Sequence, residues 1–272
     1  MIYIIKEIFI RRNLIRELVL KDLKLRYSRP VLGIFWVFLS PFLTVAVFYI
    51  VFSLILKVKI AEAPFVFYLM SAVFPWRFFQ DSLICSATSL VDNKNLIRES
   101  NFPHYLIPFS INLTNIIIFL PSLIILITTS FILKGISILT LLLPAVLAIH
   151  FILTLGLSIM FSIFYVKWRD IKYILEVILL LLFYLTPACY SLYLVKDSFS
   201  PVLFKVYIYN PFTIILNLYR VTLCKGFYSS IEKEIGLISL IFVPIVFAIA
   251  VLLLGIYLYR KNKASINDYL PY

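Results

Sequence analysis

Long runs of apolar residues, uninterrupted by charge, constrain this chain more than any other feature. Several runs exceed the roughly 20 residues that cross the hydrocarbon core of a bilayer as an α-helix. Of the 272 residues, 63% are hydrophobic and only 14% are charged, whereas about a quarter of a soluble domain is charged. A transmembrane β-barrel would instead show alternating apolar segments of about ten residues. The chain is therefore predicted to be an all-α integral membrane protein.

The apolar runs predict six transmembrane helices, at about 33–56, 65–91, 106–133, 138–166, 171–195 and 236–259. An even number places both termini on one side of the membrane. Most of the 25 Lys and Arg residues lie in segments on that side, so the positive-inside rule predicts that both termini are cytoplasmic. The predicted organisation is a cytoplasmic interface helix (1–30), a six-helix transmembrane domain (31–260) and a cytoplasmic tail (261–272).

The first thirty residues predict an amphipathic helix. Apolar residues recur at helical spacing between positions 4 and 19, and Arg11, Arg12 and Arg16 lie on other faces. Such a helix lies in the membrane interface and is attracted to anionic headgroups. A generic positive-inside anchor remains the alternative.

The stretch before the last predicted span is long but apolar. Between 196 and 230 it reads as short helical or re-entrant pieces, broken at Pro211 and Gly226. Irregular backbone at membrane depth is tolerated only inside protein or beside a water-filled cavity. These pieces are therefore predicted to form an exit gate.

The motifs of several enzyme classes are missing from the sequence. It contains no GxxxxGK[ST] phosphate loop, no HExxH metal motif and no GxSxG nucleophile motif. Arg77 and Asp81 are charged residues at membrane depth, four apart on one predicted helix face, where they can pair. A local structural pair is favoured over a proton or ion relay. No metal site and no cofactor on this chain are predicted.

Four segments together resemble the membrane-spanning permease subunits of ABC exporters for polysaccharides such as O-antigen, capsule and teichoic acid. In chain order they are "ELVLKDLKLRYSRPVLGIFWVFLSP" (17–41), "FPWRFFQDSLICSATSLVDNKNLIRESNFPHYLIP" (74–108), "WRDIKYILEVILLLLFYLTPACYSLYLV" (168–195) and "NPFTIILNLYRVTLCKG" (210–226). Arg77 departs from the family pattern, in which a small or polar residue is usual at that position.

This resemblance implies a homodimer in the bacterial cytoplasmic (inner) membrane with two copies of an ABC nucleotide-binding subunit, which bind ATP and Mg. The implied substrate is an undecaprenyl-linked polysaccharide, foremost O-antigen, which passes through a channel along the dimer axis. The motifs outside the last span place five residues in the gate region: Pro187, Tyr190, Asn210, Pro211 and Arg220. Membrane lipid is a further partner, and nucleic acid is not.

An ATP-hydrolysing partner must push on this chain through a rigid cytoplasmic element. The segment "DNKNLIRESNFPHY" (92–105) reads as a short polar helix that ends before Phe102-Pro103. The predicted coupling residues are Asn95, Leu96, Ile97, Arg98 and Glu99. An ordinary solvated turn is the alternative.

Two further groups are candidates for contact with the substrate. The aromatic residues Phe35, Phe38, Phe42, Tyr49 and Phe52 fall on one stripe of a helix with 3.6 residues per turn. This stripe lines the channel, or else it faces lipid or a neighbouring helix. Arg11, Arg12 and Arg16 suit the pyrophosphate of a lipid carrier, or simply bulk anionic lipid.

Two other function classes remain open at this point. A membrane-embedded glycolipid-modifying transferase would need a catalytic cluster near the interface, where Arg169, Asp170 and Glu176 are the best available group. An ion-coupled flippase for lipid-linked sugars would need more charges at mid-membrane.

Overall fold

The computed structural model describes residues 7, 9–27, 35–58, 60, 63–99, 102–133 and 137–269, and these residues form helices without any strand. The main helices are α2 (Arg12–Tyr27), α3 (Trp36–Phe48), α4 (Phe65–Asp92), α5 (Lys94–Glu99), α6 (Leu106–Leu133), α7 (Leu143–Lys167), α8 (Ile171–Leu185) and α13 (Leu237–Tyr269). The predicted all-α class is confirmed for this part of the chain.

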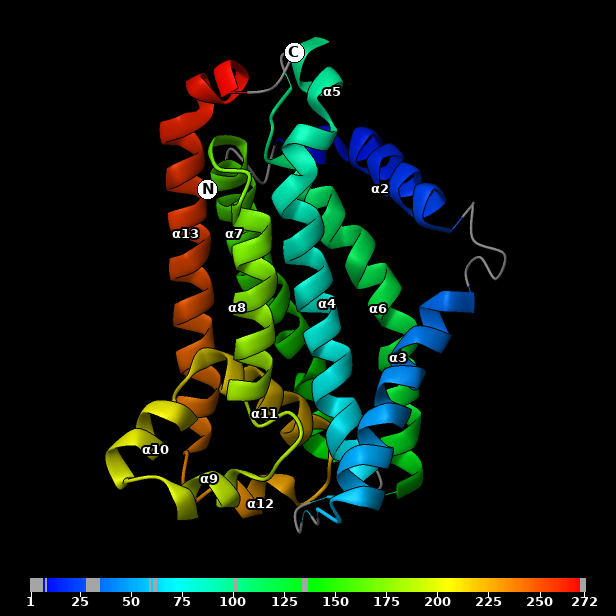
Figure 1. Cartoon of the computed structure of the whole chain (residues 1–272), viewed down its shortest axis with the longest axis vertical. Coiled ribbons are helices and arrows are strands. Elements are labelled where there is room, and N and C mark those ends of the chain that lie inside the picture. The colour runs from blue at the N-terminus through cyan, green and yellow to red at the C-terminus, as the bar shows by residue number, and fades with distance from the viewer. Residues whose placement is uncertain are drawn as a thin grey trace.

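Helix α4 forms the centre of the bundle. It packs against α3, α6, α7, α8 and α11, and its residues from Phe67 to Trp76 are buried without a break. A helix that is apolar all round occupies such a central position. Pro75 lies inside α4, which neighbouring helices permit within a membrane bundle. Figure 1 shows α4, α6, α7, α8 and α13 side by side along the length of the molecule.

Three described helices are long and apolar enough to cross a membrane: Leu106–Leu133, Ile138–Lys167 and Leu237–Lys263. The second joins the 3₁₀ turn η3 (Ile138–Leu142) to α7. A fourth crossing results if α10 (Pro201–Ile208) and α11 (Pro211–Leu223), bent by 68°, are counted together. Helices also occupy the other predicted spans at 33–56, 65–91 and 171–195, so six crossings stay a prediction.

Two of those predicted spans differ from the helices found. Helix α8 ends at Leu185 rather than near 195, because Thr186 precedes Pro187 and adopts extended backbone. The helix that follows Phe48 is a π-helix, η2 (Tyr49–Ile55). Its i→i+5 bonding replaces the α-helical period of 3.6, so the aromatic stripe cannot be extended through this part at that period.

Helix α2 turns its apolar face toward the protein. Ile15, Leu18 and Val19 are buried in one cluster with residues of α6 and α7. The predicted amphipathic pattern is present in α2, but its apolar side packs on the bundle rather than facing lipid alone. The other predicted apolar positions, Ile4, Ile5 and Ile8, lie outside the described residues.

Short helices cover one end of the bundle. They are α9 (Leu192–Ser198), α10, α11 and α12 (Phe227–Ile231), and Figure 1 shows them at the end opposite α5 and the last turns of α13. Their breaks fall at Pro211 and at Gly226, which has a positive φ of 84°. The predicted break points are therefore correct, whereas re-entry into the membrane stays a prediction.

Candidate functional site

Arg220, a predicted gate residue, connects α11 with the chain break after α8 and with the central helix α4. Its side chain is fully buried on α11, and Nη2 donates to the backbone oxygen of Pro187 at 2.6 Å. The guanidinium also lies 3.5 Å from the centre of the Tyr68 ring on α4, a cation–π arrangement. Arg220 thus holds the chain break after α8 against both α4 and α11.

The remaining predicted gate residues lie around this contact. Asn210 is the N-cap of α11, and its side chain accepts from Phe212 N at 3.0 Å, while Pro211 takes the first helical position. The backbone oxygen of Tyr190 accepts from Tyr68 Oη at 2.9 Å. The structure therefore brings Pro187, Tyr190 and Arg220 into one network, with Asn210 and Pro211 starting the helix that carries Arg220.

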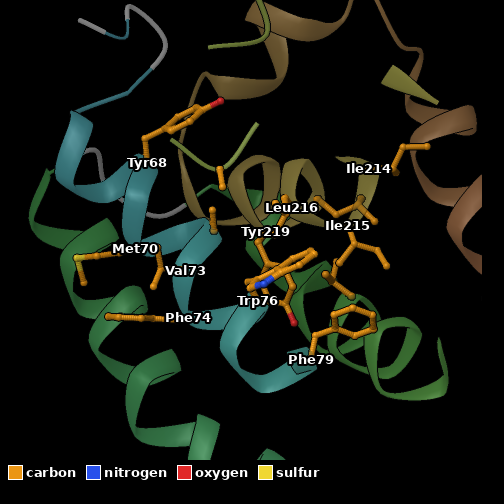
Figure 2. Close-up of a cluster of buried hydrophobic side chains, with 14 of the residues drawn as sticks. Tyr68, Met70, Val73, Phe74, Trp76, Phe79, Ile214, Ile215, Leu216 and Tyr219 are labelled. Carbon is orange, nitrogen blue, oxygen red and sulfur yellow. The ribbon is translucent and has the colours of Figure 1, made fainter. Parts of the chain in front are cut away.

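The buried core beside this network is densely packed (Figure 2). Trp76 of α4 lies beside Ile215 and Tyr219 of α11, while Tyr68 lies farther along α4. Tyr219 is fully buried, and its hydroxyl oxygen lies 3.1 Å from Nδ1 of His150. Dense aromatic packing of this kind fixes side chains in single positions.

The predicted coupling residues occupy α5, a helix of six residues. Asn95 is exposed and Ile97 is buried in the cluster that also holds α2. The side chains of Arg98 and Glu99 lie outside the described residues. Lys21 Nζ of α2 donates to Asn93 Oδ1 at 2.6 Å, directly before α5. The coupling segment and the interface helix are thus joined.

The N-terminal arginines separate into two kinds. Arg11 pairs with Glu7 at 3.3 Å, and Glu7 accepts from Tyr105 Oη at 2.6 Å. Burial and the Glu7 carboxylate raise the pKa of Tyr105, so its hydroxyl stays a donor. Arg12 and Arg16 are exposed.

The aromatic stripe on α3 and η2 is split in the structure. Phe35 and Phe42 are exposed, and Tyr49 and Phe52 are half-buried against the core. The side chain of Phe38 lies outside the described residues. Phe42 makes an edge contact with Phe74 of α4. The stripe therefore includes packing contacts as well as exposed rings.

Polar side chains form a row along α4, and of its contacts only the Arg77–Asp81 pair was predicted from the sequence. Arg26 of α2 donates to Asn115 Oδ1 at 2.8 Å and to Cys85 Sγ at 3.1 Å. Farther along α4, Arg77 pairs with Asp81 at 3.6 Å. The buried amides of Asn112 and Asn115 within an apolar α6 were the available signal, because buried polar groups need partners.

Three hollows lie along this row of polar side chains. One of about 320 Å³ lies between α2 and α4 and includes Arg26 and Asp92. A second, of about 70 Å³, includes Arg26, Arg77 and Asp81, and a third, of about 300 Å³, includes Arg77 and Asp81 on the α3 and α8 side. Adjacent hollows share side chains, so polar groups continue from the α5 end of α4 to its middle.

No group of three or more potential metal ligands occurs among the described residues. The guanidinium of Arg169, a residue considered above for a catalytic cluster, lies 5.2 Å from the centre of the Tyr165 ring. The described residues along α4 provide ion pairs, amides and aromatic rings.

Comparison with known proteins points to one class of transporter. The O-antigen export system permease protein RfbA of Klebsiella pneumoniae is 29% identical over 208 residues, which cover 76% of this chain and 78% of the relative. RfbA of Myxococcus xanthus is 29% identical over 207 residues, which cover 73% of this chain and 76% of the relative. A second Klebsiella pneumoniae RfbA is 28% identical over 208 residues.

The chain is a relative of the polysaccharide exporter permeases. The resemblance predicted from the four sequence segments is therefore confirmed. No family model matches the chain. Together with the apolar helices, the relationship identifies a multi-pass membrane protein of the transport class.

Proposed function

We propose that this chain is the permease subunit of an ATP-driven exporter that moves a lipid-linked polysaccharide, foremost O-antigen, across the bacterial inner membrane. The observation that carries the proposal is the identity shared with three O-antigen export permeases along about three quarters of the chain. The apolar helical bundle supports it, because three to four of its helices suit a bilayer.

The proposed assembly is a homodimer with two nucleotide-binding subunits, which supply ATP hydrolysis. Each copy has six crossings over 31–260, and both termini lie in the cytoplasm. The common position of α2, α5 and the last turns of α13 at one end of the bundle (Figure 1) supports this topology. Residues 1–30 form the interface segment and 261–272 the tail.

Three roles are proposed for the predicted residues. Asn95, Leu96, Ile97, Arg98 and Glu99 receive force from the ATPase, and the exposed Asn95 beside the buried Ile97 suits a helix that docks a partner on one side. Arg12 and Arg16 contact the phosphates of lipid headgroups, while Arg11 is engaged with Glu7. The network around Arg220 closes the channel at the far end, where a buried cation fixes the chain break.

The aromatic side chains Phe35, Phe38, Phe42, Tyr49 and Phe52 are proposed to line the channel where they are exposed. Flat apolar rings bind the C–H faces of sugars weakly, so a polymer slides past them rather than lodging. Phe35 and Phe42, with 55% and 41% of their surface exposed, are the members that suit this role.

The test is co-purification of this protein with its cognate ATPase in lipid, followed by measurement of ATP hydrolysis. Asn95→Ala and the double change of Arg98 and Glu99 to alanine should lower hydrolysis while leaving the complex assembled. Lys196 of α9 forms an ion pair with Glu234 at the opposite end of the bundle. Lys196→Ala removes this pair and should leave hydrolysis unchanged.

Failure of this protein to associate with the ATPase would refute the proposal. It would favour the alternatives, a membrane-embedded transferase or an ion-coupled flippase. Equal loss of activity from Lys196→Ala would instead contradict the coupling role of α5, since both changes would then act by general destabilisation.

A further inference from the structure

A charged pair stands in the middle of the central helix. At a rise of 1.5 Å per residue, Arg77 lies about 18 Å along the helix axis from the first residue of α4. Asp81 lies about 16 Å from the last residue. The two side chains pair at 3.6 Å, with 43% and 41% of their surfaces exposed. In the proposed six-crossing topology α4 crosses the bilayer, which strongly disfavours charges that face its hydrocarbon. The exposed sides of this pair therefore require water or a polar ligand.

The hollow on the α3 and α8 side provides such a place. It measures about 300 Å³, and its wall combines the pair with Gln80, Trp76, Phe183 and Tyr184. Thr44 of α3 also lines it. The site therefore holds a cation, an anion, an amide and a hydroxyl beside aromatic rings. Such walls, apolar with a few placed polar groups, are typical of sites for small polar ligands.

Sugar residues match this combination of side chains. A ring hydroxyl can donate to the Asp81 carboxylate while accepting from the Arg77 guanidinium, and the Gln80 amide can do both. The apolar C–H face of the sugar then packs against an aromatic ring. Because Arg77 and Asp81 neutralise each other, an uncharged sugar leaves the ion pair intact, whereas an anionic sugar would meet Asp81 as a like charge.

We propose that Arg77, Asp81 and Gln80 form a recognition site for uncharged sugar residues of the exported polymer. This inference rests on the proposed export function and adds the residues that select the substrate. A neighbouring hollow is lined by Arg77, Asp81 and Arg26, and the hollow beyond it, which shares Arg26, extends the polar row toward the α5 end of the helix.

The first experiment separates recognition from a structural ion pair. In cells that make the native polymer, Arg77→Ala and Asp81→Ala should each lower the rate at which polymer appears on the surface by about tenfold, the scale of one lost charged hydrogen bond. The exchange variant, Arg77→Asp with Asp81→Arg, keeps a pair but reverses the donors and acceptors. Recognition predicts that the exchange stays defective, and recovery to the wild-type rate would overturn the proposal.

Three controls keep this outcome interpretable. The amount of membrane-inserted protein and its thermal midpoint should match those of the wild type in every variant compared. Ile238→Ala shortens an exposed side chain of α13 (84% of its surface is exposed), outside the gate and the proposed recognition site, and should export normally. A strain lacking this gene that still displays the polymer would refute the export function, whereas loss of polymer in that strain with normal export by Arg77→Ala would refute the recognition site alone.

The second experiment tests the hollow directly and needs no substrate. After the three native cysteines are changed to alanine, Gln80→Cys should react with a charged, water-soluble maleimide in lipid vesicles, because thiolates form only where water reaches. Ile117→Cys is the matched control, since Ile117 is 43% exposed at a similar depth on α6. Labelling at position 80 should be faster than at position 117, because a thiol in apolar surroundings forms less thiolate. Equal or slower labelling, the result expected if lipid or a second copy fills the hollow, would overturn the proposal.

Discussion

Replacing Gly156 with alanine should push apart the two most extensively packed helices of the bundle. Helix α7 carries Gly156 and α13 carries Gly255, and their backbones meet at these residues. A Cβ at position 156 would lie 2.7 Å from both Cα and N of Leu252. Backbone atoms cannot turn aside as a flexible side chain can, so the helices must separate by about 0.7 Å or more to restore ordinary contact.

The expected cost is that of overpacking a well-fitted interface, about 1–3 kcal/mol of unfolding free energy. Small residues allow close backbone approach between membrane helices, where packing rather than hydrophobicity drives association. Gly255→Ala should cost a similar amount, since its Cβ would lie 2.6 Å from the Gly156 backbone oxygen. The double variant should cost less than the sum of both, because one separation relieves both contacts.

Denaturant unfolding of the purified protein in mixed micelles measures this effect. Gly236→Ala is the control, because a Cβ there meets nothing within 4 Å. A Gly156→Ala protein within about 0.5 kcal/mol of the wild type, the scale of an unremarkable surface change, would refute the close-contact reasoning.

Three more predictions concern other parts of the structure. Arg220→Lys keeps the charge but loses the planar fork that reaches the Pro187 carbonyl, so limited proteolysis at 186–191 should accelerate, with a stability loss of about 1–3 kcal/mol; unchanged cleavage would contradict the anchoring role. Asn210→Ala removes the cap of α11 and should lower unfolding free energy by about 1 kcal/mol, whereas Asn210→Ser should restore most of it. Burial, with Lys263 nearby, lowers the pKa of His104, so the folded protein binds that proton less readily than the unfolded chain. Stability should therefore be full at neutral pH and fall as pH drops below the unfolded value of about 6.5, and His104→Gln should flatten that decline in thermal midpoint between pH 7.5 and 5.5.

Much of the helical plan could be predicted from local pattern. Apolar runs and break residues act within a few positions along the chain, so the start of α11 at Asn210-Pro211 and the break at Gly226 are visible in sequence. The end of α8 was predicted too far along the chain, although Pro187 was available as a signal. The π-helix after Phe48 has no comparable local signal, because its bonding depends on how the neighbouring helices pack.

Some contacts of the candidate site could likewise be predicted from the sequence, and others could not. The resemblance to a permease family selected Pro187, Tyr190 and Arg220 from motifs far apart in sequence. Folding brings Arg220 to the Pro187 carbonyl, and Tyr68, which contacts both Arg220 and Tyr190, links the third residue to them. The pairing of Arg77 with Asp81 followed from their spacing of four residues. The pairing of Arg26 with Asn115 spans 89 positions, and no local rule joins them.

By itself, the sequence determined that this protein is a helical membrane protein, because hydrophobic length and charge distribution are properties of each segment alone. It also carried the relationship to polysaccharide exporter permeases. Only the tertiary structure decided which face of α2 is buried, where Gly156 and Gly255 meet, and that Arg77 and Asp81 border hollows. Those features depend on which helices lie against each other, and a helix can satisfy its own backbone hydrogen bonds beside many different neighbours.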